Sequence, residues 1–338
     1  MISRTNPAVL VCALALTSVA LHQARAQTSS TGENTAPAAQ EAEGALAVKP
    51  QLPSQLDIAT FDPRADLAFG AYQRGYYLTA FELALKRAES GDAAAQTLIA
   101  ELYDKGLGIG RDPKEAAAWY GLAAEAGNPS AQFAYAIKLL EGKHVTMDRG
   151  KARVLLEKAA AAGLPEASFN LAQMIVAEVR GAAGMQQALP FYRKAAEQGV
   201  ADAYYAMAQI YAEGFGVEKD DATAFSWMLK AAKAGLDTAQ VELGIWLANG
   251  RGTSRNERDA FGWINRAATG GNAIAQNRLA KMFALGIGTK VDKSAGVKWH
   301  IIAKRAGLDD PWLDEFVQGL DGETRDKGLV DANNWRAG

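Results

Sequence analysis

Cysteine is almost missing from this chain of 338 residues, because the sequence holds only one, Cys12, near its start. A single thiol cannot build the disulfide framework on which many small secreted domains depend, nor a cysteine-ligated zinc site. Packing alone therefore has to hold the fold together. The composition permits this, since 49% of the residues are hydrophobic and 22% are charged, as in ordinary globular proteins.

Histidine and excess positive charge are scarce as well. Only His144 and His300 follow the first 26 residues, and their separation in the sequence offers no metal-ligand spacing. Basic and acidic residues number 36 and 38, without the basic stripe of a nucleic-acid-binding surface. No serine–histidine–aspartate or comparable constellation stands out. We therefore expect no metal site, no nucleic-acid partner and no enzymatic activity.

The start of the chain reads as two segments outside the folded core. Arg4, the apolar run 8–20 and the A-R-A pattern at 24–26 are typical of a secretory signal peptide (residues 1–26) cleaved after Ala26. The apolar run is too short for a membrane span, so we expect a periplasmic or secreted protein with no stable membrane insertion after cleavage. Residues 27–60, rich in Ser, Thr, Ala, Gln, Glu and Pro, are expected to be a disordered linker.

A 36-residue repeat dominates the rest of the sequence. An alanine, a bulky apolar residue and a glycine each recur at this step. The alanines are Ala95, Ala131, Ala167, Ala203, Ala239 and Ala275; the bulky residues are Trp119, Leu155, Phe191, Trp227, Trp263 and Trp299; the glycines are Gly127, Gly163, Gly199, Gly235, Gly271 and Gly307. A fixed period in this range indicates a solenoid, in which each repeat packs on its neighbours.

Each repeat reads as two helices joined by a glycine-containing loop. In the copy at 92–127, Gly106 can end the first helix in a left-handed conformation. Asp112 then caps the second helix, and Pro113 fits its first turn. The loop resembles a nucleotide-binding loop, but a phosphate loop follows a strand, whereas here a helix precedes it. We interpret it as helix capping and expect no cofactor.

The stretch "AQTLIAELYDKGLGIGRDPKEAAAWYGLAAEAGN" (95–128) resembles a Sel1-like repeat, a relative of the tetratricopeptide repeat. The resemblance covers 92–307 as six copies and extends to a short copy at 61–91. It implies an all-α fold, a right-handed α-solenoid of helix-turn-helix repeats. Residues 308–338 break the period and are expected to form a C-terminal helical cap.

Two copies depart from the pattern in their loops. His144 and Arg180 stand where the second glycine belongs in the copies at 128–163 and 164–199. We still expect helix pairs there. His144 itself is interpreted as a solvated loop residue.

The resemblance also implies a function. Exported Sel1-like proteins of bacteria include regulators of envelope sensor kinases and of exopolysaccharide control, and scaffolds in polysaccharide export. A cysteine-rich branch is β-lactamase-like, but it depends on a disulfide in each repeat. We therefore expect a protein-interaction module, an adapter or regulator with a protein partner in the cell envelope. A scaffold of polysaccharide or cell-wall machinery is the alternative, an enzyme is less favoured, and the oligomeric state stays open.

The first helices carry the candidate binding residues. In stacked helix pairs the first helices line the concave side, and residues two and six positions after each repeat alanine point away from the packed face. In the middle copies these residues are Phe133, Ile137, Phe169, Gln173, Tyr205, Gln209, Val241 and Ile245. The outer copies place polar residues there, which predicts a groove with an apolar centre and polar rims, suited to a peptide or helix. The alternative is that the aromatic side chains pack against the neighbouring repeat.

Overall fold

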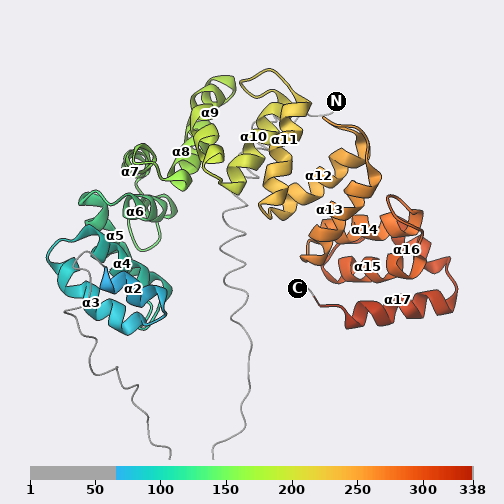
Figure 1. The fold of residues 1–338 in the computed structure, drawn as a ribbon, viewed down its shortest axis with the longest axis horizontal. Coiled ribbons are helices and arrows are strands. Elements are labelled where there is room, and N and C mark those ends of the chain that lie inside the picture. Colours follow the sequence, from blue (N-terminus) through green and yellow to red (C-terminus); the bar gives the residue numbers. More distant parts are fainter. Residues whose placement is uncertain (1–65, 337–338) are drawn as a thin grey trace, which may run out of the picture. The chain divides into compact units, whose positions relative to one another are not determined.

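The computed structural model describes residues 66–336, and this part of the chain is helical throughout (Figure 1). Residues 66–336 contain sixteen helices, α2 to α17, and no strand. The expected all-α fold of tandem helix pairs is confirmed. The signal peptide, the linker at 27–60 and the first residues of the short copy at 61–91 lie outside the described residues.

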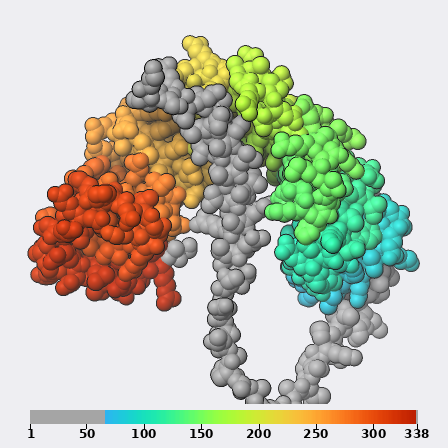
Figure 2. All heavy atoms as spheres, turned by 180° about the vertical axis from the view of Figure 1, so that it is seen from behind, coloured from blue at the N-terminus to red at the C-terminus, as the bar shows by residue number. Residues whose placement is uncertain are grey.

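The described residues form two compact units of consecutive helix pairs, 66–164 and 165–336. The first unit contains α2 (Leu67–Gln73), α3 (Tyr77–Glu89), α4 (Ala93–Lys105), α5 (Pro113–Glu125), α6 (Pro129–Glu141) and α7 (Arg149–Ala161). The second contains α8 (Pro165–Glu178), α9 (Ala182–Glu197), α10 (Ala201–Glu213), α11 (Asp221–Lys233), α12 (Asp237–Asn249), α13 (Glu257–Thr269), α14 (Ala273–Leu285), α15 (Lys293–Arg305), α16 (Pro311–Gln318) and α17 (Gly322–Asn334). Within each unit, the heavy atoms of successive pairs abut (Figure 2). We call the even-numbered helices from α4 to α14 the first helices and the odd-numbered helices from α5 to α15 the second helices.

The helix ends follow the capping chemistry that the sequence predicts. Gly106 ends α4 with φ 68°, and its N–H donates to the Leu102 carbonyl. Asp112 precedes α5, and its side chain accepts hydrogen bonds from the N–H groups of Lys114 and Glu115 at 2.9 and 3.1 Å. These contacts satisfy backbone groups that a helix terminus otherwise leaves unpaired. The glycine loop therefore joins two helices, as the capping interpretation requires.

The second glycine of the loop packs closely against the preceding repeat. A Cβ atom on Gly252 would lie 2.0 Å from the carbonyl oxygen of Asp221 at the start of α11. His144 occupies this position in the copy at 128–163 and has φ 64°, the only positive φ of a non-glycine residue within residues 66–336. The loop around it is more exposed than the loop around Gly252. Where a side chain replaces the second glycine, the loop between the two helices is therefore more exposed.

Both copies with divergent loops still form helix pairs, as expected. In the copy at 164–199, α9 begins at Ala182, although the 36-residue step from α7 and α11 would place its start at residue 185. The connection from α8 is correspondingly shorter, and Gly181 in it has φ 80°. The divergent sequence thus lengthens the second helix by about one turn and leaves the pairing intact.

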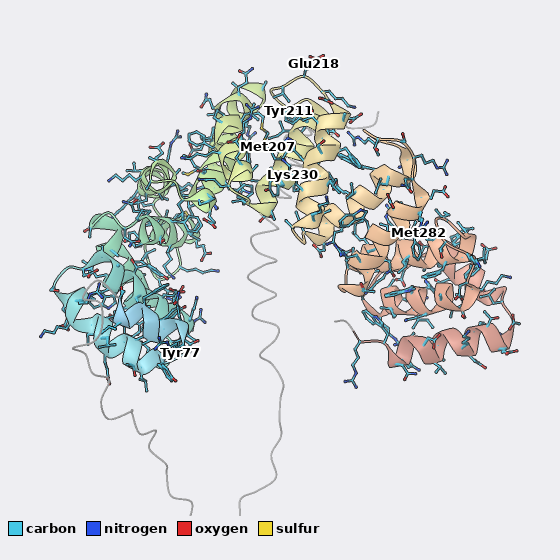
Figure 3. The ribbon with its side chains drawn as sticks, in the orientation of Figure 1. Tyr77, Met207, Tyr211, Glu218, Lys230 and Met282 are labelled. Atoms are coloured by element: carbon cyan, nitrogen blue, oxygen red, sulfur yellow. The ribbon has the colours of Figure 1, made fainter. Side chains whose placement is uncertain are left out.

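Alanines and glutamines fill the space between helices. The repeat alanines are buried, with exposures of 0 to 3%. The residue after four of these alanines is a glutamine whose Nε2 donates to a carbonyl of the helix before it: Gln96 to Ala88, Gln132 to Ala124, Gln240 to Ala232 and Gln276 to Ala268. Met207 of α10 is fully buried, and Lys230 of α11 lies 4.0 Å over the ring of Trp227 (Figure 3). Small residues let the helices approach, and the glutamines join successive pairs by hydrogen bonds.

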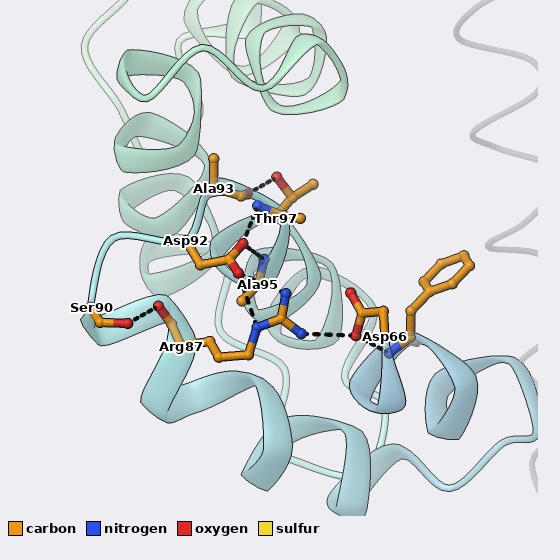
Figure 4. A network of polar contacts seen from close by, with 9 residues as sticks. Asp66, Arg87, Ser90, Asp92, Ala93, Ala95 and Thr97 are labelled. Atoms are coloured by element: carbon orange, nitrogen blue, oxygen red, sulfur yellow. Dashed lines mark hydrogen bonds and ion pairs between the residues drawn. The ribbon is translucent and has the colours of Figure 1, made fainter. Parts of the chain in front are cut away.

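Arg87 of α3 connects the beginnings of two neighbouring helices (Figure 4). Its guanidinium lies 3.0 Å from Asp66 Oδ1 and 2.6 Å from Asp92 Oδ2. Asp66 precedes α2 and accepts a hydrogen bond from Phe69 N–H, while Asp92 precedes α4 and accepts one from Ala95 N–H. The same carboxylates thus cap helices and bind Arg87, and the backbone hydrogen bond from Ala95 is the main reason why the pKa of Asp92 is lowered.

The last two helices cover the final repeat. Leu313 of α16 and Ala332 of α17 are buried, and the ring of Trp335 packs edge-on against Trp299 of α15 at 5.5 Å. The side chain of Arg305 donates to the Ala332 carbonyl. This arrangement buries the apolar side of α15, which would otherwise lack a following repeat.

Candidate protein-binding surface

The eight predicted groove residues all lie on first helices, but in two different units. Phe133 and Ile137 belong to α6 in the unit 66–164. Both are half-buried. The other six belong to α8, α10 and α12 in the unit 165–336, so these three helices carry most of the candidate surface.

Burial divides the six residues of the unit 165–336 into two kinds. Phe169 and Val241 are buried, with exposures of 5% and 6%. The ring of Phe169 packs edge-on against Tyr192 of α9 at 5.7 Å, within its own helix pair. The remaining four are half-buried and keep part of their surface in contact with solvent: Gln173, Tyr205, Gln209 and Ile245. The apolar contribution to the surface is therefore smaller than the sequence pattern suggests.

A polar cluster joins α10 to α12 at the centre of this surface. The Tyr205 hydroxyl donates to Glu242 Oε1 at 2.6 Å, and Gln209 Nε2 donates to Glu242 Oε2 at 2.7 Å. Burial raises the pKa of the Glu242 carboxyl, although these two hydrogen bonds act in the opposite direction. Burial and the neighbouring carboxylate also raise the pKa of Tyr205. Glu242 is therefore held in one orientation by two neutral donors.

Glu242 was not among the residues predicted from the sequence. It stands three positions after its repeat alanine, one residue beyond the positions used for the prediction. The residues at this position in the six copies are Leu98, Ala134, Asn170, Ala206, Glu242 and Arg278. A single carboxylate in this series is the sequence feature by which it could have been found.

One repeat earlier the same contact is incomplete. Gln173 of α8 stands 36 residues before Gln209, and Ala206 of α10 stands 36 residues before Glu242. Gln173 Nε2 is buried and has no hydrogen-bond partner among residues 66–336. Because alanine replaces the carboxylate, the amide lacks the acceptor that Gln209 has.

Two other contacts between neighbouring even-numbered helices pair a carboxylate with a lysine. Lys138 of α6 lies 2.8 Å from Asp104 of α4, and Lys281 of α14 lies 2.6 Å from Asp310 at the start of α16. Burial alone would raise the pKa of Asp310, but hydrogen bonds from Lys281 and Asn277 outweigh it and lower the pKa to about 2. These carboxylates are compensated by cations of the chain itself.

Residues 66–336 contain neither a cluster of metal-ligating side chains nor a helix suited to span a membrane. No three His, Cys, Asp or Glu side chains within residues 66–336 are grouped so that they could hold a metal ion. None of the helices in this range combines the length and apolarity needed to cross a membrane. The two histidines of this range lie apart: His144 is exposed in its loop, and His300 Nε2 contacts Asp314 at 2.9 Å beside the last two helices.

Comparison with solved structures finds the same architecture in bacterial proteins. A Sel1 repeat protein from Oxalobacter formigenes is 31% identical with a TM-score of 0.64; the match covers 71% of this chain and 98% of that one. A protective antigen of uropathogenic Escherichia coli that displays an SLR fold is 29% identical with a TM-score of 0.65, over 75% of this chain. This chain spans only 56% of the length of that antigen. No curated protein matched.

The family comparison agrees with the repeat read from the sequence. The Sel1 repeat model matches residues 93–128, 129–164, 165–200, 201–236, 238–272 and 273–308. These matches follow one another along more than half of the chain, and the helix pairs of the structure coincide with them. Sel1 repeats generally mediate protein–protein interactions. The chain belongs to the Sel1 repeat family.

Proposed function

We propose that this chain is a periplasmic adapter or regulator that holds a segment of another envelope protein on α8, α10 and α12. The observation that carries the proposal is the half-buried cluster of Tyr205, Gln209 and Glu242. Fixed polar groups beside partly exposed apolar side chains are characteristic of protein-recognition surfaces. The partner could be the periplasmic domain of a sensor kinase or a protein of exopolysaccharide control.

The export part of the proposal rests on residues 1–26. A signal peptide ending at Ala26 places the repeats outside the cytoplasm, where envelope proteins present their periplasmic segments. Mass spectrometry of the protein purified from the envelope fraction tests this part. A mature chain that starts at Gln27 supports it, and a chain that keeps residues 1–26 in the cytoplasmic fraction contradicts it.

No catalytic step is assigned to the chain. The β-lactamase-like branch of the family depends on a disulfide in each repeat, and the only cysteine here is Cys12. The proposed role therefore needs only binding energy from the surface of the helices. Turnover of a cell-wall or β-lactam substrate by the purified protein would contradict this part of the proposal.

Site-specific photocrosslinking in intact cells tests the binding surface. A photoreactive amino acid at Ile245, which is half-buried on α12, is expected to trap one envelope protein in high yield. The matched control is the same amino acid at Ser226, which is exposed on α11. Trapping of the same protein with equal yield at both positions, or no trapping at Ile245, contradicts the assigned surface.

A further inference from the structure

We propose that the unit 165–336 selects an extended partner segment in which a basic side chain binds Glu242 and an acidic side chain about three residues away binds Arg278. This inference rests on the proposed function, because it assigns chemistry to the partner on that surface and extends the surface to Arg278 of α14.

Glu242 has no cationic partner in the described part of the chain. Its two hydrogen-bond donors, Tyr205 and Gln209, are neutral. Arg251 acts on it only at a distance, because its guanidinium is bound to Asp221 and Glu213. A half-buried carboxylate without a cation carries a desolvation cost that a basic side chain of a partner would offset.

Comparable contacts elsewhere in the chain already contain their cation. Lys138 binds Asp104, and Lys281 binds Asp310. Among these carboxylates, Glu242 alone has its position fixed while its charge stays uncompensated. A fixed geometry also favours recognition, since the partner need not order the carboxylate when it binds.

The next repeat presents the opposite charge at the same position. Arg278 stands 36 residues after Glu242 on α14 and is exposed. Within residues 66–336, the side chain of Arg278 makes no hydrogen bond or ion pair. The repeat before Glu242 has Ala206 at this position, so α10, α12 and α14 present a neutral, an acidic and a basic residue in that order.

The spacing of stacked helices fits an extended chain. Asn272, which caps α14, donates to Asp237 of α12 at 3.3 Å, so these two first helices contact each other through side chains. Helices in such contact lie roughly 10 Å apart, and an extended segment advances about 3.3 Å per residue. Neighbouring repeat positions are therefore about three residues apart along a bound segment. When a basic residue of the partner lies over α12, an acidic residue about three positions away lies over α14. The surface binds a single basic residue and not a run of them, because Ala206 of α10 stands where α12 has its carboxylate.

An array of ten-residue peptides tests the pattern with the purified protein. Each peptide carries one Lys and one Asp at a defined separation on a randomised apolar background. We expect the tightest binding at a separation of about three residues, and at least ten-fold weaker binding when Lys is replaced by norleucine. The variant Glu242→Gln should show the same loss, whereas Glu218→Gln, an exposed loop position (Figure 3), should bind as the original protein does.

Charge reversal at the exposed position provides a second test that does not disturb packing. With the variant Arg278→Glu, the peptide position that the original protein prefers to be Asp should instead prefer Lys. Thermal unfolding of each variant checks that it is folded. The proposal is overturned if binding ignores Lys, if Glu242→Gln binds like the original protein, or if no peptide binds. Crosslinking at Ile245 separates the two ideas, since a trapped partner combined with a failed array leaves the proposed function intact.

Discussion

Tyr205 of α10 donates a hydrogen bond to Glu242 of α12 across 2.6 Å, and thereby links the helices of successive repeats. The link is unusual in this chain because it fixes a carboxylate whose negative charge no cation balances in the described residues. Ionisation of Glu242 therefore disfavours the folded state, whereas ionisation of Asp310, which binds Lys281, favours it.

Replacing Glu242 by glutamine should leave the folded state as stable at pH 7 or make it more stable. The pKa of this carboxyl is raised in the folded state, so its favourable contribution is complete below the unfolded pKa of about 4.3 and is lost as the pH rises through the folded pKa. Glu242→Gln removes that loss. The difference in Tm between variant and original protein should therefore grow from pH 4 to pH 7. The control Glu218→Gln, at an exposed position, should show no such trend.

Replacing Asp310 by asparagine should have the opposite effect. The pKa of Asp310 is lowered to about 2, so its stabilisation is present above the unfolded pKa of about 3.9 and is lost as the pH falls toward 2. We expect Asp310→Asn to reduce the free energy of unfolding by about 2 kcal/mol at pH 7, from the size of this pKa shift. Urea unfolding at pH 7 and pH 2 measures the effect, which should be much smaller at pH 2. Asp309→Asn, at the exposed neighbouring position, should change little; an equal loss in both variants would falsify the role of the Lys281 contact.

Two glycines of the same helix pair should respond to alanine in opposite ways. Gly252 has φ 67°, and its added Cβ would lie 2.0 Å from a backbone oxygen, so Gly252→Ala should cost more than about 1 kcal/mol. Gly262 lies inside α13, where an added Cβ would meet no atom of the described residues within 4 Å apart from its own stretch of helix, so Gly262→Ala should stabilise by roughly 1 kcal/mol. Thermal unfolding of the two variants gives both signs. Similar Tm changes of one sign would contradict the described loop packing.

Replacing His144 by glycine should stabilise the protein. His144 has φ 64°, a conformation that costs a side-chain-bearing residue of order 1 kcal/mol and that glycine adopts without strain. The greater flexibility of glycine in the unfolded chain opposes the gain, so we expect a net increase of about 0.5 kcal/mol in the free energy of unfolding. His144→Ala, which keeps a Cβ atom, is the control. An increase of the same size in both variants would point to the imidazole rather than to the backbone.

The fold was predictable in detail because its determinants are local. Asp112 caps a helix through its own neighbours, and Gly106 ends one through its own φ angle, so each boundary can be read from a few adjacent letters. The repetition of these letters every 36 residues then implies stacking. The glutamines at 96, 132, 240 and 276 follow the same step and bond to carbonyls of the helix before them, but no local rule identifies that acceptor.

The candidate surface was predictable only in part. The helical period predicted that Tyr205 and Gln209 point away from the packed face, and in the structure both are half-buried on α10. It treated Phe169 in the same way, although the ring of Phe169 is buried against Tyr192. Periodicity assigns a side chain to one side of its own helix, whereas burial depends on how closely the next helix approaches. Whether this surface binds a partner stays a prediction.

By itself the sequence determined the helices, their caps and the 36-residue register, because these follow from backbone hydrogen bonding and packing between residues close in the chain. Only the tertiary structure decided which charges meet. Lys281 reaches Asp310 and is neutralised, whereas Glu242 meets only Tyr205 and Gln209 among residues 66–336. Such contacts join residues 29 to 37 positions apart, and a shift of a few ångströms between helices would make or break them, since hydrogen bonds and ion pairs depend steeply on distance.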